Sequence, residues 1–218
     1  MRIGIISEGH SDRAVIASLI LRASSLEWSD IKALRPVYKF DATDLAISDD
    51  KSKSNWTHIK NECESKELIS AFLSIEGQDF VAVHIDTAEA ELYEVDRPAK
   101  GDKSYCSELR QKVISKIQTW LGGEYVNNVL YAVAIEETEA WLLSIYTDMK
   151  DTTVSAKPKE KLSFELGRKG INSTVNESNF ADLSKPFRKM KEKEFQGILK
   201  TNCSLLEFFN EVSEKLSV

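Results

Sequence analysis

The sequence predicts an α/β protein with a doubly wound, mainly parallel four-stranded sheet and a helical C-terminal extension. Short β-branched apolar runs alternate with segments of helical spacing, and the connections between the runs are helical rather than tight hairpin turns. Beyond residue 150 only helical patterns occur. We therefore expect an α/β domain over residues 1–146 and a helical extension over residues 147–218 that packs on it.

Four short runs have the composition of parallel strands, which are buried on both faces. The clearest is DFVAVHI, which is apolar almost throughout and stops at Asp86. The four predicted strands cover residues 2–7, 35–40, 79–85 and 129–135. Helices are predicted from Ser11, a good N-cap, and over residues 56–73, 105–121, 157–170, 184–198 and 204–216. Pro186 is expected near the start of its helix.

The net charge of −6 is unevenly distributed. Residues 1–149 carry 16 Lys or Arg and 25 Asp or Glu, a net of −9, whereas residues 150–200 carry 12 and 7, a net of +5. An acidic body beside a basic segment fits a metal site next to a surface for an anionic polymer, and it also fits a solvated pair of helices.

The sequence lacks the marks of membrane insertion or export. No run approaches the roughly 20 apolar residues of a membrane helix, and the short apolar run at the N-terminus ends at once in Glu8. Cys63, Cys106 and Cys203 are widely spaced and odd in number, which predicts three reduced, buried thiols. We expect a cytoplasmic protein with no membrane contact.

Every predicted strand ends in a carboxylate. The residues are Glu8 after the first strand, Asp41 and Asp44 after the second, Asp86 after the third, and Glu136, Glu137 and Glu139 after the fourth. Ligands of open α/β sheets bind outside the carboxyl ends of the strands. Carboxylates crowded there repel one another unless a cation or protons compensate. Oxygen ligands select hard cations, so we expect a divalent metal that bridges the protein to a phosphate.

Three segments at these strand ends carry a resemblance to a known family. They are IISEGHSD at residues 5–12, VAVHIDTAEAE at residues 81–91 and IEETEAWLL at residues 135–143. In this order they resemble motifs of the TOPRIM superfamily, and most closely its small bacterial members from phage-defence loci, relatives of the OLD-type nucleases. The resemblance covers about residues 1–145 and implies a TOPRIM-like (Rossmann-like) sheet.

The resemblance implies roles for several acids. Glu8 would be the general acid/base and a metal ligand, Asp86 a metal ligand, and Gly9 would let the backbone turn tightly beside the substrate. The family's second aspartate is Ala88 here, so Glu89 or Glu139 is expected to replace it, with Glu136 as a further ligand candidate. For Glu8 and Asp86 the alternative is a structural role at a helix start or in a turn.

The activity implied is phosphoryl transfer on DNA or RNA, most simply by a nuclease with Mg²⁺ (or Mn²⁺), together with a protein partner in a defence system. Because of Ala88, the alternative is a non-catalytic metal- or nucleotide-binding partner subunit that recognises nucleic acid or a phage component. The sequence contains no G-x-x-x-x-G-K-[ST] phosphate loop, which argues against an ATPase.

Further candidates come from single residue types. His10 neighbours Glu8 and titrates in the range useful for proton transfer, and Arg13 is placed to contact phosphate. His84 alternates with apolar residues and is expected to be a hydrogen-bonded core histidine rather than a ligand. Lys185, Arg188 and Lys189 share a helix face that suits a nucleic-acid backbone, or else a solvated helix with i,i+4 ion pairs.

Overall fold

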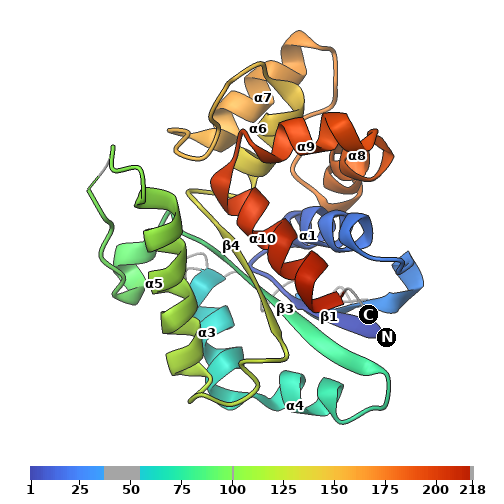
Figure 1. Ribbon diagram of the computed structural model, residues 1–218, viewed down its shortest axis with the longest axis vertical. Helices are drawn as coiled ribbons and strands as arrows, with labels where there is room; N and C mark the ends of the chain where they lie inside the picture. The colour runs from blue at the N-terminus through green and yellow to red at the C-terminus, as the bar shows by residue number, and fades with distance from the viewer. Residues whose placement is uncertain (37–54, 100, 217–218) are drawn as a thin grey trace, which may run out of the picture.

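A computed structural model describes residues 1–36, 55–99 and 101–216 of the chain (Figure 1). Within these residues four parallel strands form one sheet in the order β2-β1-β3-β4. The strands are β1 (Arg2–Ile6), β2 (Ile31–Arg35), β3 (Gln78–Asp86) and β4 (Val129–Ala134). The predicted α/β class with a parallel, doubly wound, Rossmann-like sheet is confirmed.

Helices cover both faces of the sheet (Figure 1). One face is covered by α1 (His10–Ala23) and α10 (Cys203–Leu216). Four more helices pack on these two and on one another in the same core: α6 (Glu139–Tyr146), α7 (Pro158–Arg168), α8 (Glu177–Lys189) and α9 (Glu192–Leu199). The other is covered by α3 (Asn55–Ser65), α4 (Glu67–Leu73) and α5 (Tyr105–Trp120). Two short 3₁₀ helices, η1 (Trp28–Asp30) and η2 (Ala90–Tyr93), lie in the connections.

Alternate strand residues supply two separate cores. In β1, Ile3 and Ile5 pack with α1 and the C-terminal helices, while Ile6 packs with α3, α4 and α5. In β3 the same alternation sends Ala82 to the first core and Val83 to the second. Since successive side chains of a strand point to opposite faces, a sheet covered on both sides requires apolar residues at consecutive positions.

Gly4 of β1 lies against side chains of the neighbouring strand β2 and of α4. A Cβ on this residue would lie 2.5 Å from Leu34 Cδ1, 3.0 Å from Leu34 Cγ and 3.4 Å from a ring carbon of Phe72. Contacts under 3.0 Å force neighbouring atoms to move, and because the atom at 2.5 Å is the end of the half-buried Leu34 side chain, we expect a cost at the low end of the range for overpacking, about 1 kcal/mol.

We expect Gly4→Ala to lower the free energy of unfolding by that amount, measured by urea denaturation. Gly167→Ala is the matched control, because beyond its own helix backbone and its two chain neighbours no atom of the described residues lies within 4 Å of the added methyl group. Gly167 lies in the last turn of α7, where this change is expected to stabilise the protein by at most roughly 0.5–1 kcal/mol, the gain in a helix interior. Equal effects of the two substitutions would contradict the close packing at Gly4.

The helices beyond residue 147 pack into the same core as the sheet. α8 lies along α1, with Ser184 Oγ 2.8 Å from Ser18 Oγ in the buried contact. α10 packs on β4, where Glu211 accepts hydrogen bonds from Tyr131 N–H and from Arg110. Among the described residues, no helix combines the length and the hydropathy needed to cross a membrane.

Several predicted boundaries are wrong. The second strand is β2 (Ile31–Arg35), which lies before the predicted range of 35–40, and residues 37–40 lie outside the described residues. As an edge strand β2 is only partly buried, so its sequence lacks a continuous apolar run. Pro36 follows it and has no N–H to continue the ladder. The helix predicted over residues 56–73 is broken at Lys66, whose φ is +60°.

The C-terminal half also differs from prediction in two respects. The helix predicted over residues 184–198 is two helices, α8 and α9, separated by extended backbone at Met190 and Lys191, and Pro186 lies in the last turn of α8. Cys106 and Cys203 form a disulfide that joins α5 to α10, so of the three cysteines only Cys63 is a free, buried thiol.

Candidate functional site

The strand order changes direction between β1 and β3. The chain passes from β1 outward to β2 and then returns to the other side of β1 for β3. In open α/β sheets such a switch point opens the crevice where ligands bind. Glu8 follows β1 and Asp86 ends β3. The two meet here, because Glu8 Oε1 accepts a hydrogen bond of 2.9 Å from the Asp86 backbone N–H.

Asp12 joins this pair from the first turn of α1. Only 8% of Asp12 is exposed, although an aspartate at a helix start ordinarily points into solvent. Gly9 makes room for it, since a Cβ on Gly9 would lie 2.9 Å from Asp12 Oδ2. The predicted role of Gly9 in a tight turn thus takes a specific form, in which the missing side chain lets the Asp12 carboxylate approach the strand end.

His84 links Asp86 to the start of α6. Its Nε2 lies 2.9 Å from Thr138 Oγ1 and 3.2 Å from Asp86 Oδ1, and Thr138 Oγ1 also donates to Asp86 Oδ1 at 3.3 Å. His84 is fully buried. The expectation of a hydrogen-bonded core histidine is therefore confirmed, and the same residue is a neighbour of the site.

Glu139, the first residue of α6, is the fourth acid at this place. It is 3% exposed, and its Oε2 accepts no hydrogen bond from the described part of the chain. Lys159 of α7 lies nearby and pairs with Glu137 at 3.0 Å. A buried carboxylate oxygen without a donor is costly, so this atom has capacity for a further partner. We call Glu8, Asp12, Asp86 and Glu139 the acidic cluster.

Burial and mutual repulsion raise the pKa values of three acids in the acidic cluster. Burial, followed by the charge of Asp86, raises the pKa of both Glu8 and Glu139 to about 8. Burial also raises the pKa of Asp86. Burial alone would lower the pKa of His84, but the hydrogen bond to Asp86 and the charges of Asp86, Asp12 and Glu8 raise it to about 9. Perturbed acids grouped at a sheet's switch point are typical of functional sites.

The donor set of the acidic cluster fits a hard divalent cation. Asp12, His84 and Asp86 each offer a ligand atom, and these atoms lie within 4.8 Å of one another. Two carboxylates with a third at Glu139 suit Mg²⁺ or Mn²⁺, both of which prefer oxygen ligands. A cation here would offset the repulsion between the acids.

Glu136 lies beside the acidic cluster but is held by an arginine. Arg97 donates to Glu136 Oε1 at 2.9 Å, to Tyr105 Oη at 3.2 Å and to Thr87 O, and it pairs with Glu91 at 2.8 Å. The backbone of Glu136 has a φ of +63°, and its N–H donates to Thr87 Oγ1 at 2.8 Å. Arg97 thus fastens the loop after β3 to the loop after β4.

We expect Arg97→Ala to lower the free energy of unfolding by about 2 kcal/mol, since it leaves Glu136 and the Thr87 carbonyl without their charged donor. Urea denaturation measures this. Lys116→Ala is the control, because it removes a surface ion pair with the exposed Glu94 and is expected to cost less than about 1 kcal/mol. Equal losses in the two variants would contradict a bracing role for Arg97.

The other predicted residues around Glu8 make their contacts outside the acidic cluster. His10 and Arg13 both face Glu177 of α8, with Arg13 at 2.8 Å and His10 at 3.6 Å. Burial and the charge of Arg13 lower the pKa of His10. Glu89 is exposed on the loop before η2. The structure does not bring these residues into the acidic cluster.

The predicted basic face lies away from the acidic cluster. α1 and α8 run in the same direction, because Arg13 pairs with Glu177 near both helix starts and Arg22 binds Met190 O near both ends. Lys185 pairs with Asp182, and Arg188 lies 5.0 Å from the Trp28 ring. Together with Lys189 they occupy the far end of α8 from Glu8. Asp41 and Asp44 lie outside the described residues.

Sequence reasoning missed Asp12, Thr138 and Lys159, and it assigned His84 to the core alone. One signal was available for His84: it precedes Asp86 by two residues on a strand, so both side chains point to the same face. Comparisons with protein-family models, with characterised proteins and with solved structures find no match for this chain.

Proposed function

We propose that this protein is a divalent-metal-dependent phosphoryl-transfer enzyme that acts on nucleic acid, most simply a nuclease. One observation carries the proposal: four acids, from the turn after β1, from α1, from the end of β3 and from the start of α6, lie at the sheet's switch point, and one buried oxygen, Glu139 Oε2, has no donor among the described residues. Bound there, Mg²⁺ or Mn²⁺ would neutralise charge on the scissile phosphate and lower the pKa of the attacking water.

The chain's own residues divide the remaining work. Asp12, Asp86 and Glu139 would hold the cation, with His84 orienting Asp86 through its hydrogen bond. Glu8 accepts the hydrogen bond from the Asp86 backbone N–H and has a pKa raised to about 8 by burial and by Asp86. Its carboxyl group can therefore take or give a proton near neutral pH. Glu8 is the proposed general acid/base.

A non-catalytic partner subunit is the second candidate. Ala88 motivates it, because this residue stands where the TOPRIM pattern has an aspartate, and its N–H is engaged by Glu136 O at 2.9 Å. This version predicts binding of an oligonucleotide or nucleotide without turnover. The TOPRIM relationship, the protein partner within a defence system and the cytoplasmic location rest on the sequence alone.

The test is incubation of purified protein with labelled DNA and RNA, in Mg²⁺, Mn²⁺ or a chelator. We expect cleavage of at least one substrate with metal and none with chelator. Asp86→Asn, purified in the same way, is the control against a contaminating nuclease and is expected to be inactive. Intact substrates under every metal condition would reject the enzyme, and calorimetry with oligonucleotide would then decide for or against the binding subunit.

A further inference from the structure

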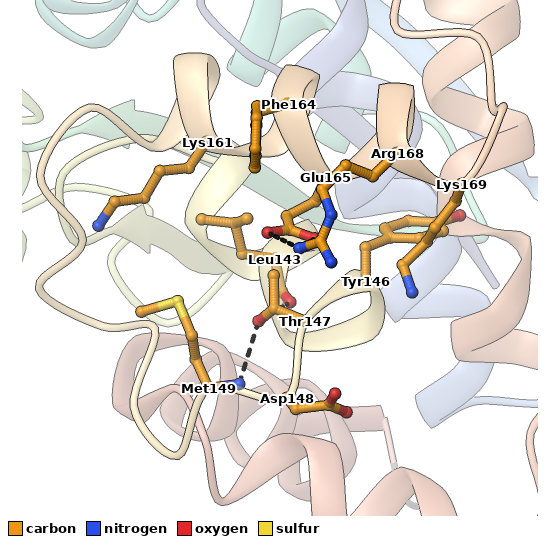
Figure 2. Close-up of a pocket in the computed structure, with 10 residues that line it drawn as sticks. All are labelled: Leu143, Tyr146, Thr147, Asp148, Met149, Lys161, Phe164, Glu165, Arg168 and Lys169. Atoms are coloured by element: carbon orange, nitrogen blue, oxygen red, sulfur yellow. Dashed lines mark hydrogen bonds and ion pairs between the residues drawn. The ribbon is translucent and has the colours of Figure 1, made fainter.

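A cavity of about 590 Å³ lies between α6 and α7, outside the acidic cluster (Figure 2). Leu143, Tyr146 and Thr147 of the α6 side form its floor, and Phe164 points toward Leu143 from α7 above it. The Tyr146 hydroxyl donates to Leu183 O at 2.8 Å, which holds the ring in place. The volume is within the range of sites for small organic groups.

Phe164 is the feature of this cavity that most needs an explanation. It is 65% exposed, although it belongs to a helix whose leucines, Leu162 and Leu166, are buried in the core. Arg168 lies 5.8 Å from its ring, and Met149 opposite is also exposed. An exposed aromatic ring beside an arginine and over an apolar floor is the arrangement on which an unpaired base stacks.

The charges around Phe164 favour an anionic ligand. Residues 157–169 carry five Lys or Arg and two Glu, a net of +3. The nearest glutamate, Glu165, is balanced by Arg168 at 3.3 Å, whereas Lys169 makes no ion pair with any described residue. Asp148 at the edge of the cavity is an acceptor suited to the amino group of a base.

Both helices that form the cavity start at the acidic cluster. α6 begins with Glu139 of the cluster and ends with Tyr146, seven residues and about 10 Å further along. The start of α7 lies close to the start of α6, because Lys159 pairs with Glu137 at 3.0 Å. Arg168 lies about 14 Å further along α7. A chain held at the acidic cluster can therefore reach the cavity within a few nucleotides.

We propose that the cavity between α6 and α7 is a base-binding subsite for single-stranded nucleic acid, with one base on Phe164 and adjoining phosphates on Lys161, Arg168 and Lys169. A duplex cannot place a base in this subsite, because its bases are already paired and stacked, so it would bind only through its phosphates. The assignment rests on the proposed function for its substrate class, and it deepens that function by naming the single strand as the form bound.

Binding is measured by fluorescence anisotropy with a labelled single-stranded oligonucleotide, in chelator so that no cleavage occurs. We expect Phe164→Ala to raise Kd by roughly 5- to 100-fold, the effect of losing one stacked base. Lys169→Glu is expected to weaken binding and to flatten the dependence of log K on log salt by roughly 0.7. A duplex of the same sequence is expected to bind more weakly than the single strand.

Matched controls separate this cavity from general surface effects. Ile75→Ala removes another apolar side chain that is more than half exposed, and Lys193→Glu reverses an exposed charge on α9. Both are expected to leave Kd unchanged. Circular dichroism checks that all four variants are folded.

The outcomes distinguish the two proposals. Wild-type affinity in Phe164→Ala, or no measurable binding of a single strand by the wild type, overturns the subsite. If Phe164→Ala binds normally while the wild type cleaves with metal, the subsite is wrong and the enzyme stands. If Phe164→Ala loses affinity while the wild type never cleaves, the subsite stands and the enzyme is wrong.

Discussion

Glu8→Gln is expected to lower the rate of metal-dependent phosphodiester cleavage by about 10²–10⁴-fold, the range for loss of a general acid/base. Glutamine has nearly the same shape, and its carbonyl oxygen still accepts the hydrogen bond from Asp86 N–H. The variant should therefore keep its fold and most of its metal affinity. Only the group that titrates is removed.

The comparison that isolates Glu8 uses single-turnover cleavage and metal calorimetry on three proteins. Asp86→Asn is expected to lose metal binding and activity together, because Asp86 lies among the ligand atoms. Glu89→Gln is expected to behave as the wild type, since Glu89 is exposed outside the acidic cluster. A Glu8→Gln protein with the wild-type rate would remove Glu8 from the proton transfer.

The metal-free protein is expected to lose several kcal/mol of stability between about pH 5 and about pH 9. Glu8 and Glu139 have pKa values near 8 in the folded state, against 4.5 as the ordinary value. A carboxyl whose pKa is raised by folding contributes stability below its unfolded pKa, and this contribution is lost as the pH rises through the folded value. The loss is about 1.4 kcal/mol for each pH unit and group, reduced where the groups interact.

The titration of His84 also lowers the stability of the folded protein as the pH rises, over a higher pH range than that of the two glutamates. Its pKa is about 9 in the folded state against 6.5, so its contribution is complete below 6.5 and disappears as the pH rises through 9. Thermal unfolding in chelator across this range measures the sum. Mg²⁺ or Mn²⁺ is expected to restore stability most at the alkaline end, where the acids are ionised.

Glu139→Gln provides the control for this pH dependence. It is expected to raise the melting temperature of the metal-free protein near pH 8 and to flatten the pH profile, whereas Glu67→Gln, at an exposed position on α4, changes neither. A flat profile in the wild type, or one that rises with pH, would mean that the acids are not held close together in the folded protein.

The fold was predictable because a doubly covered parallel sheet leaves a strong mark on the sequence. In β3 every side chain from Val81 to Ile85 is buried, so the whole run is visible. β2 failed this rule, since an edge strand is covered less and its residues are mixed. The helix break at Lys66 could not be predicted from the sequence, because lysine is not a residue type that favours a positive φ.

The acids on strand ends were predictable and the remainder of the site was not. Glu8 and Asp86 follow directly from the rule that ligands gather at the carboxyl ends of parallel strands. In the sequence, Asp12 looks like an acid that stabilises the first turn of a helix. Only its burial against Gly9 in the structure shows that it belongs to the acidic cluster. The sequence places Glu136 among the metal-ligand candidates because it follows a strand. Its actual partner, Arg97, lies in a polar loop without a periodic pattern, so the sequence does not reveal this ion pair.

The metal at the acidic cluster is the claim on which the proposed chemistry depends. Diffraction from crystals soaked in Mn²⁺, with an anomalous difference map, tests it directly. The account predicts a peak in contact with the carboxylates of Asp12 and Asp86, beside His84 and within reach of Glu139. An empty map at these residues, with Mn²⁺ bound only to exposed acids elsewhere on the surface, would contradict it.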